Sequence, residues 1–299
     1  MNIIKFNKYY RQFGYFSVIL IIISLSLLLF KGLNYGVDFK GGTLIEIRIV
    51  GSDHSVSKVR DVFNKSNLSN LTVKNFGNDK DYIVKFQKQN LDNPEFINNL
   101  KIDVSKSFPN INFRRVENVG PKVSSELLRS GIIAISLSLT AMLFYIWIRF
   151  EWQFSLGAII ALFHDVIITL GIFSILSLEI NLSIVAAVLT IVGYSMNDTV
   201  VIFDRVRDNL KKYIDLHIFD LTNQSINETL SRTILTSVTT LLALFSIFFL
   251  GGEILRGFSF AMIIGVIIGT YSSIYIANPI LVKLNVDHYT IVKKDEEKN

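Results

Sequence analysis

The chain has 299 residues, half of them apolar, and its mean hydropathy of +0.43 excludes an ordinary soluble globular domain of this size. The formal net charge is +5 and cysteine is absent, which excludes disulfides, iron–sulfur clusters and thiol catalysis. The four histidines lie far apart in the chain, so no pair has the spacing of a metal site, and no metal or other cofactor is expected.

The first apolar run, Gly14–Phe30, is long enough to cross a membrane. Crossing about 30 Å of hydrocarbon takes about 17–25 helical residues. Lys5, Lys8 and Arg11 precede the run, as they would in a secretion signal. The run is too long for such a signal, however, and no small-residue cleavage site follows it. The sequence therefore predicts a retained first membrane helix behind a short N-terminal segment, residues 1–13.

Residues 31–130 predict a small α+β domain between the first and second membrane helices. Apolar residues recur every second residue in some stretches of this segment and about every 3.6 residues in others, which predicts strands and helices in alternation. Their order, β-α-β-β-α-β, is that of the ferredoxin-like fold. Because this fold carries many functions, and no catalytic set of residues is present in the segment, we expect a surface that contacts another protein. FKGGT (Phe39–Thr43) lacks the spacing of a phosphate loop, so its glycines are expected to permit a tight turn. The predicted elements are Gly42–Val50, Val56–Ser66, Leu71–Gly77, Asp81–Gln87, Asn93–Phe108 and Asn110–Val119.

Residues 131–282 hold five further apolar runs, which makes the expected fold an α-helical polytopic membrane protein with six transmembrane helices. Residues 283–299 then form a polar tail. In the sixth helix, Gly265 and Gly269 have the small-xxx-small spacing that lets membrane helices approach closely. The five predicted spans are Gly131–Ile148, Phe154–Leu178, Leu182–Phe203, Thr233–Leu250 and Gly257–Leu281.

Lysine and arginine gather on one side of these predicted helices. These basic residues lie in the N-terminus, in the turn with Arg149, in the connection between the fourth and fifth helices and in the tail. The short loops on the opposite side hold only Glu179, Glu253 and Arg256 as charged residues. By the positive-inside rule, both termini are cytoplasmic and residues 31–130 lie outside.

The fourth predicted helix carries Asn197 and Asp198 within an apolar run. A charge at this depth costs at least about 2.5–3.5 kcal/mol, so the acid needs partners or must be neutral. An acid that takes up and releases a proton can serve an ion-driven cycle, whereas the alternative is that both side chains only link neighbouring helices. An intramembrane acid favours the ion-handling interpretation. Thr190 and Tyr194 lie on the helical face of Asp198 and are expected to bond to it or to hold a water beside it.

Three other residues are candidates to share this role. His164 and Asp165 are adjacent in the third helix and point about 100° apart, so only one of them can face the fourth helix. A proton relay and a structural link between helices both remain open for this pair. Arg232 begins the fifth span and either pairs with an intramembrane acid or anchors the helix at the interface.

Three stretches together closely resemble the SecD/SecF family of bacterial protein-export subunits. They are GVDFKGGTLIEI (Gly36–Ile47), VENVGPKVSSELLRSGI (Val116–Ile132) and GYSMNDTVVIFDRVRDN (Gly193–Asn209). The remaining helices also look like those of the family, so the resemblance covers nearly the whole chain. The motif positions are Gly36, Asp38, Gly41, Gly42, Gly193, Asp204 and Arg205.

The resemblance implies one half of a transporter of the resistance-nodulation-division type, which pairs with SecD to complete twelve spans. It implies association with the SecYEG channel, often with YajC, and action on an unfolded exported polypeptide after SecA has begun to push it. It also implies that a proton or sodium gradient drives the work. The family's coupling acid corresponds to Asp198 and the arginine of its relay to Arg232.

Two alternatives remain open. A half of the same transporter type could export a lipid or a small molecule, and a scaffold could stabilise a membrane complex without moving anything. An enzyme is not expected, because no nucleophile–base pair or metal site can be assembled from the motifs. Nucleic-acid binding is not expected either, because membrane topology accounts for the cytoplasmic basic residues.

Overall fold

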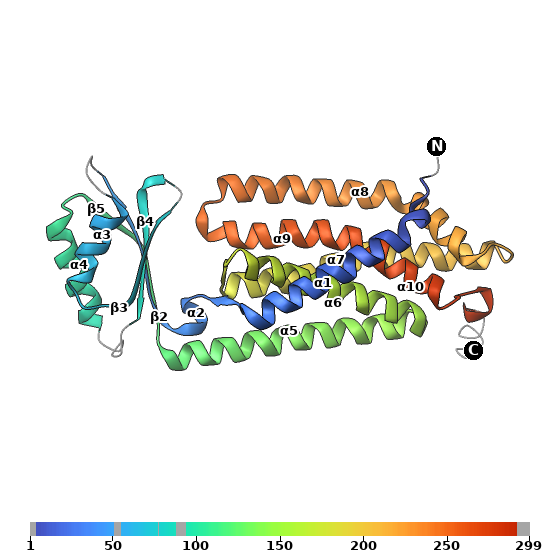
Figure 1. Ribbon diagram of the computed structural model, residues 1–299, viewed down its shortest axis with the longest axis horizontal. Helices are drawn as coiled ribbons and strands as arrows, with labels where there is room; N and C mark the ends of the chain where they lie inside the picture. The colour runs from blue at the N-terminus through green and yellow to red at the C-terminus, as the bar shows by residue number, and fades with distance from the viewer. Residues whose placement is uncertain (1–3, 51–54, 77, 88–93, 292–299) are drawn as a thin grey trace. The chain divides into compact units, whose positions relative to one another are not determined.

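The structure is a computed structural model that describes residues 4–50, 55–76, 78–87 and 94–291 (Figure 1). Among these residues, six helices are long and apolar enough to cross a membrane, and a separate sheet carries two helices. The predicted fold class, a six-helix membrane protein with a small α+β domain, is confirmed. The chain divides into a helical unit (Met1–Asn34, Ile133–Glu179 and Ser183–Asn299) and an α+β unit (Tyr35–Ile132 and Ile180–Leu182).

Five of the six membrane helices are continuous, and the sixth contains a π-helical turn. In that sixth span, α9 (Glu253–Ser272) runs into the π-helical η2 (Ser273–Ala277) and then α10 (Asn278–Lys283). The other five are α1 (Tyr10–Phe30, after the 3₁₀ turn η1 at Phe6–Tyr9), α5 (Pro121–Arg149), α6 (Trp152–Ile175), α7 (Leu182–Lys212) and α8 (Ile218–Leu250).

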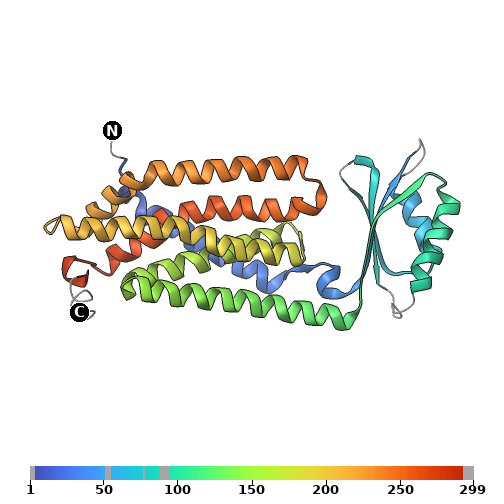
Figure 2. The same ribbon diagram turned by 180° about the vertical axis from the view of Figure 1, so that it is seen from behind.

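Several helices extend beyond the predicted spans. α5 begins at Pro121, in the first helical position, where proline's fixed φ and missing N–H are tolerated. The connection between the fourth and fifth spans, expected as a loop, is a hairpin of helix ends (Figure 2). Asn209 Nδ2 joins the hairpin by donating to Ser225 Oγ at 2.9 Å and to Glu228 Oε2 at 2.8 Å. Hydropathy marks only the part of a helix that lies in hydrocarbon, so it cannot show where a helix ends in water.

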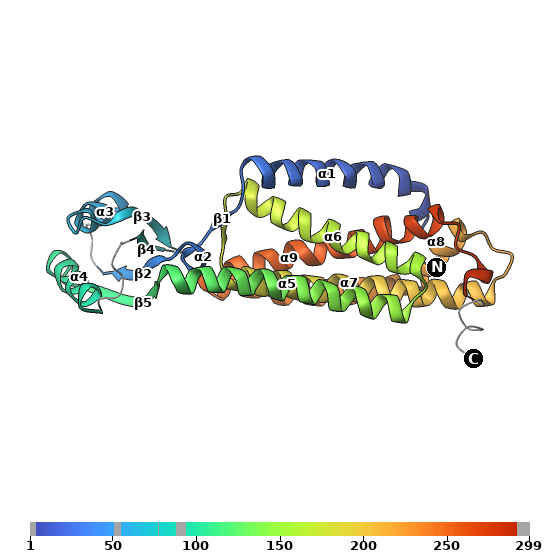
Figure 3. The ribbon, with the colours of Figure 1, turned by 90° about the horizontal axis from the view of Figure 1, so that it is seen from below.

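α6, α7 and the sixth span form the interior of the helical unit. α1, α5 and α8 expose most of their apolar side chains, as helices that face lipid do. α1 lies along α6 (Figure 3), and the two approach so closely that a Cβ added to Gly171 would lie 2.9 Å from Ser24 Cα. This arrangement puts the side chains of α6, α7 and α9 at the centre of the unit.

The α+β unit has the predicted ferredoxin-like topology. Its sheet order is β3-β4-β2-β5, all neighbours are antiparallel, and α3 and α4 cover one face (Figure 1). Ile45 and Ile47 of β2 are fully buried in the core with Val59 and Phe63 of α3. Asn93, the expected first residue of the second helix, lies outside the described residues. The elements are β2 (Gly42–Ile49), α3 (Val56–Asn64), β3 (Ser69–Phe76), β4 (Asn78–Gln87), α4 (Pro94–Ser107) and β5 (Ile111–Val119).

Ion pairs join the strands of this sheet. Arg48 of β2 donates two hydrogen bonds to Asp81 of β4, from Nε to Oδ1 at 2.7 Å and from Nη2 to Oδ2 at 2.6 Å. Arg115 of β5 contacts Glu46 of β2 at 3.4 Å. The hydrogen bonds from Arg48 hold the pKa of the Asp81 carboxyl below its ordinary value, although burial opposes them, and the charge of Arg114 adds to the same lowering. Asp81 is therefore a stabilising charge of the sheet.

Replacing Asp81 by asparagine is expected to destabilise the α+β unit by about 1–2 kcal/mol at neutral pH, because a bond to a charged group contributes about 1.5–3 kcal/mol and Arg48 remains partly solvated. Since the folded pKa is lowered, the contribution exists above the ordinary value of about 3.9 and disappears as pH falls through the folded pKa. Amide exchange of β2 and β4 in the full chain measures the effect. The difference between the two proteins should be present near pH 7 and shrink as the pH falls below about 3.9 towards the folded pKa, and a difference that does not shrink would contradict the assignment.

Candidate ion-coupling site

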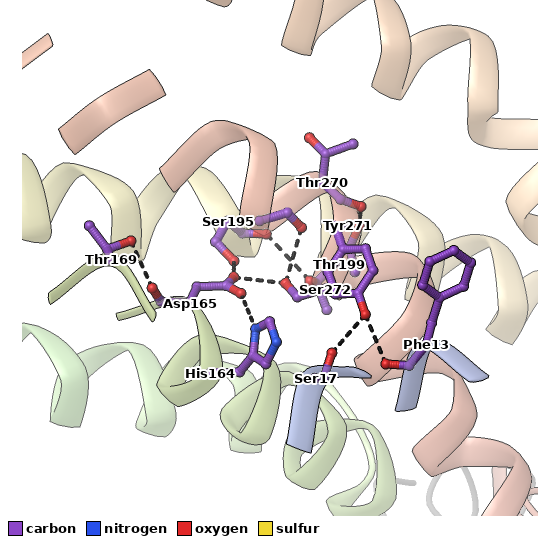
Figure 4. A network of polar contacts seen from close by, with 12 residues as sticks. Phe13, Ser17, His164, Asp165, Thr169, Ser195, Thr199, Thr270, Tyr271 and Ser272 are labelled. Carbon is purple, nitrogen blue, oxygen red and sulfur yellow. Dashed lines mark hydrogen bonds and ion pairs between the residues drawn. The ribbon is translucent and has the colours of Figure 1, made fainter. Parts of the chain in front are cut away.

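The most deeply buried acid of the helical unit is Asp165, on α6. Its side chain is fully buried, and its Oδ2 atom accepts hydrogen bonds from Ser195 Oγ of α7 at 2.5 Å and from Ser272 Oγ of α9 at 2.7 Å (Figure 4). Its Oδ1 atom lies 2.8 Å from Nδ1 of His164, which is itself only 1% exposed. One carboxylate therefore joins the three innermost helices.

Close packing of α9 against α7 brings Ser195 and Ser272 to the same carboxylate oxygen of Asp165. A Cβ added to Gly269 would lie 3.2 Å from Ser195 Cα, so the glycine lets the two backbones approach. Gly265, one turn earlier, similarly faces Ile191 of α7. The small-xxx-small spacing seen in the sequence thus serves the contact between the fourth and sixth spans.

His164 turns away from α7 and packs on α9. Its ring stacks on Tyr271, with centroids 6.0 Å apart and planes at 25°. Its Nε2 atom is buried and has no hydrogen-bond partner among the described residues. The sequence argument that only one of the adjacent pair can face the fourth helix agrees with this arrangement, in which Asp165 is that residue.

Asp198, on α7, is 3% exposed and lies beside a second set of polar groups. Its Oδ2 atom accepts a hydrogen bond from Thr270 Oγ1 of α9 at 3.2 Å. Ser237 of α8 interacts with the same carboxylate and is bonded to Thr270 at 2.8 Å. Arg232 of α8 is near enough for a favourable charge interaction with Asp198, although its own side chain is largely exposed. Among the described residues, the carboxylate has hydrogen-bond partners but no direct ion pair.

Three consecutive residues of α9 serve both acids. Thr270 bonds to Asp198, Tyr271 stacks on His164, and Ser272 bonds to Asp165. The π-helical turn starts at the next residue, Ser273, whose carbonyl accepts from Asn278 Nδ2 at 2.7 Å. Single π-helical turns inside longer helices occur often at functional sites. A shift of residues 270–273 would therefore change the contacts of both Asp198 and Asp165.

Two sequence expectations, for Thr190 and Tyr194, do not match the structure, and the role of Asn197 stays a prediction. Asn197 is exposed on α7 and is not brought to Asp198, because adjacent helical residues point about 100° apart. Thr190 donates to the Ala186 carbonyl at 2.8 Å and Tyr194 to the Thr236 carbonyl at 3.1 Å. The expectation that these two side chains bond to Asp198 is wrong, because backbone oxygens already satisfy their hydroxyls.

The charged motif residues near the end of α7 are paired. Asp204 accepts from Arg149 Nη2 at 2.8 Å, and Arg205 Nε donates to Glu228 Oε2 at 2.5 Å. These pairs connect α7 to the end of α5 and to the hairpin helix α8, some distance along α7 from Asp198. They serve as links between helices.

The glycine-rich motif shapes a turn, as expected. Gly41 and Gly42 have φ of +74° and +133°, and a Cβ on Gly42 would lie 2.8 Å from the Phe86 carbonyl oxygen. Asp38 Oδ2 accepts from the backbone N–H of Leu182 at 2.9 Å and so caps the start of α7. Gly36 N donates to the Ile180 carbonyl at 2.9 Å. Gly193 is exposed, and a Cβ there would meet nothing within 4 Å in this chain.

Sequence profiles of known families match most of the chain. The family described as "Protein export membrane protein SecD/SecF, C-terminal" matches residues 100–287, and "SecD/SecF GG Motif" matches residues 26–50. The chain is 47% identical over 268 residues to protein translocase subunit SecF of Rickettsia bellii, which covers 89% of this chain and 88% of that protein. It is 44% identical over 281 residues to the subunit of that name in Cereibacter sphaeroides, covering 91% and 86%.

Two solved structures have similar folds. The crystal structure of SecDF, a translocon-associated membrane protein from Thermus thermophilus, superposes with a TM-score of 0.85 at 34% identity and covers 94% of this chain. SecDF in a super-membrane-facing form gives a TM-score of 0.70 at 33% identity and covers the whole chain. This chain spans only 38% and 40% of those two chains. The fold, the glycine turn and the sequence matches agree, and the chain belongs to the SecD/SecF family of protein export membrane proteins.

Proposed function

We propose that an ion gradient, acting through Asp198, drives the part that this chain takes in protein export. The curated relatives are named translocase subunits, and the chain is accordingly an auxiliary subunit of the Sec protein translocase. One observation carries the gradient-driven part of the proposal. Asp198 is a buried carboxylate among membrane spans, with hydroxyl partners and an arginine nearby but no direct ion pair in the part of the chain that the structure describes.

The proposed cycle alternates between a charged and a neutral Asp198. The charged form attracts Arg232 on α8 and accepts from Thr270 on α9, whereas a protonated or cation-bound form loses most of the attraction to Arg232. Each form therefore favours a different packing of α7 against α8 and α9. A potential of about 100 mV supplies about 2.3 kcal/mol per charge, which biases two states by more than tenfold. Asp165 and His164 act with Asp198 as a second polar centre, and Asn197 is the exposed neighbour of Asp198 on α7.

The chain is proposed to act with SecD as its partner. Asn197, Gly193 and Thr190 leave a polar, small-residue stripe exposed on α7, and Arg232 is exposed on α8. Lipid is a poor solvent for such groups, so another protein helix is the better neighbour. We propose that the pair associates with SecYEG and YajC in the bacterial inner membrane and acts on the unfolded polypeptide after SecA. The termini are then cytoplasmic and the α+β unit periplasmic, in accord with the positive-inside rule.

Export of a labelled precursor tests this function. Cells or vesicles lacking the chain should release precursors slowly in the presence of an ion gradient, and restoring the chain should restore the gradient-dependent rate. Co-purification from native membranes should recover a SecD subunit. The two alternatives predict otherwise. A lipid or small-molecule exporter would leave precursor release unchanged, and a scaffold would support release at the same rate with and without the gradient.

A further inference from the structure

α1 contacts the rest of the helical unit along a narrow line. Its buried residues are Tyr10, Ser17 and Ser24, which are spaced seven apart and thus lie on one face. Each meets a different helix. The Tyr10 hydroxyl donates to Thr222 Oγ1 of α8 at 3.3 Å, Ser17 Oγ lies 2.7 Å from the Tyr271 hydroxyl of α9, and Ser24 lies against Gly171 of α6.

The middle contact leads directly to the buried acid. The Tyr271 hydroxyl donates to the Phe13 carbonyl at 2.9 Å, and Ser17 can donate to the same hydroxyl (Figure 4). The Tyr271 ring stacks on His164, whose Nδ1 atom is 2.8 Å from Asp165. A continuous set of contacts therefore runs from Asp165 through His164 and Tyr271 to the backbone of α1.

The other two buried residues of α1 meet uncharged residues: Tyr10 bonds to Thr222, and Ser24 packs against Gly171. Gly171 leaves no room between α6 and Ser24, so this contact suits a fixed pivot. Ser17 lies seven residues away, about 10 Å along the helix, and its hydroxyl bonds to a tyrosine that touches the ion site. α1 ends at Phe30, and the chain begins β2 of the α+β unit at Gly42. A tilt of α1 about Ser24 would therefore reach the α+β unit through the short segment between Phe30 and Gly42.

We propose that Tyr271 is the positioning residue that transmits the charge state of the ion-coupling site to α1, and through α1 to the α+β unit. The proposal rests on the function proposed above. The His164 ring bonds to Asp165 and stacks on Tyr271, so a change of charge at Asp165 reaches Tyr271 through the imidazole ring. The groups that face His164 are Asp165 on its own helix and Tyr271 on α9. Because Thr270 and Ser272 flank Tyr271, a change at either acid moves the same segment.

Tyr271→Phe tests the proposal, because it keeps the stacked ring and removes only the hydroxyl that bonds to Phe13 and Ser17 of α1. The full chain is co-expressed with its SecD partner in membranes that lack the native copy. Two quantities are measured in parallel, gradient-dependent release of a precursor and ion uptake into vesicles, with a pH-sensitive dye for protons and labelled sodium for Na⁺. We expect release to fall at least fivefold while ion uptake stays within twofold of the wild type.

Matched variants keep the test decisive. Ser17→Ala removes the partner hydroxyl on α1 and should reproduce the defect, and Ser17→Thr should restore release. Tyr275→Phe removes a hydroxyl from the same aromatic cluster, where the ring lies 5.4 Å from that of Tyr271, and should change neither quantity. Unchanged release in both Tyr271→Phe and Ser17→Ala would overturn the proposal, as would an equal loss of release and ion uptake. Failure of the proposed function is distinct, since Asp198→Asn would then retain both quantities.

Discussion

Asp198→Asn is expected to abolish the gradient-dependent part of protein export, with at least a tenfold fall in the gradient-stimulated rate of precursor release. Asparagine keeps the shape of the side chain and can still accept from Thr270. It cannot carry a negative charge, so the attraction to Arg232 no longer changes during the cycle. Removing a buried charge also removes its desolvation cost, so the variant should insert and fold normally. Release in vesicles with and without an imposed gradient measures the effect.

Asp204→Asn is the matched control on the same helix. Asp204 is paired with Arg149 at 2.8 Å, and both side chains are about two-fifths exposed, at 40% and 42%. An exposed pair of this kind contributes about 0–1 kcal/mol, so we expect a small change in stability and a normal gradient response. Full gradient-dependent export by Asp198→Asn would show that another group couples the ion and that this acid only links the helices.

The sequence predicts the fold well because each signal is local. Apolar runs long enough for hydrocarbon predict the six membrane helices, and alternating periods predict the ferredoxin-like order of the α+β unit. The ends of α5, α7 and α8 are not predicted, because hydropathy falls at the membrane surface while the helices continue into water. The π-helical turn in the sixth span is not predicted either, because it depends on packing against α6 and on the bond from Asn278.

The site is predicted less completely, because its partners come from different helices. Asp198, Asp165 and His164 stand out as ionisable groups in apolar runs. Ser195, Ser272 and Thr270 do not, since serine and threonine in membrane helices usually bond to their own backbone. Two signals in the sequence point to these serines. Ser195 and Asp198 lie three residues apart on one helical face, and the serine pair at Ser272–Ser273 interrupts an apolar run. The hydrogen bond between Asp165 and Ser195 could be predicted only if it were known that Gly269 brings α9 and α7 together.

Asp165→Ala is expected to destabilise the helical unit by about 3–5 kcal/mol, the effect of breaking a buried charged network by removing one partner. The substitution leaves the hydroxyls of Ser195 and Ser272 and the His164 ring without their shared acceptor, and it releases α6, α7 and α9 from one another. Thermal unfolding of the purified chain with its partner measures the loss. A change below about 1 kcal/mol would show that water replaces the carboxylate at no cost, and that the acid does not hold the helices.

Asp165→Asn separates the structural role from the ion role. An asparagine oxygen can still accept from Ser195 and Ser272, and its NH₂ group can donate to Nδ1 of the other His164 tautomer, so the network keeps its connections. We expect stability within about 1–2 kcal/mol of the wild type, because buried polar groups keep their partners. Gradient-dependent export should nevertheless fall at least fivefold, because an amide can neither carry a negative charge nor take up a proton during the cycle. Normal export by a stable Asp165→Asn protein would assign this pair to holding the helices together and leave Asp198 as the acid that couples the ion to movement.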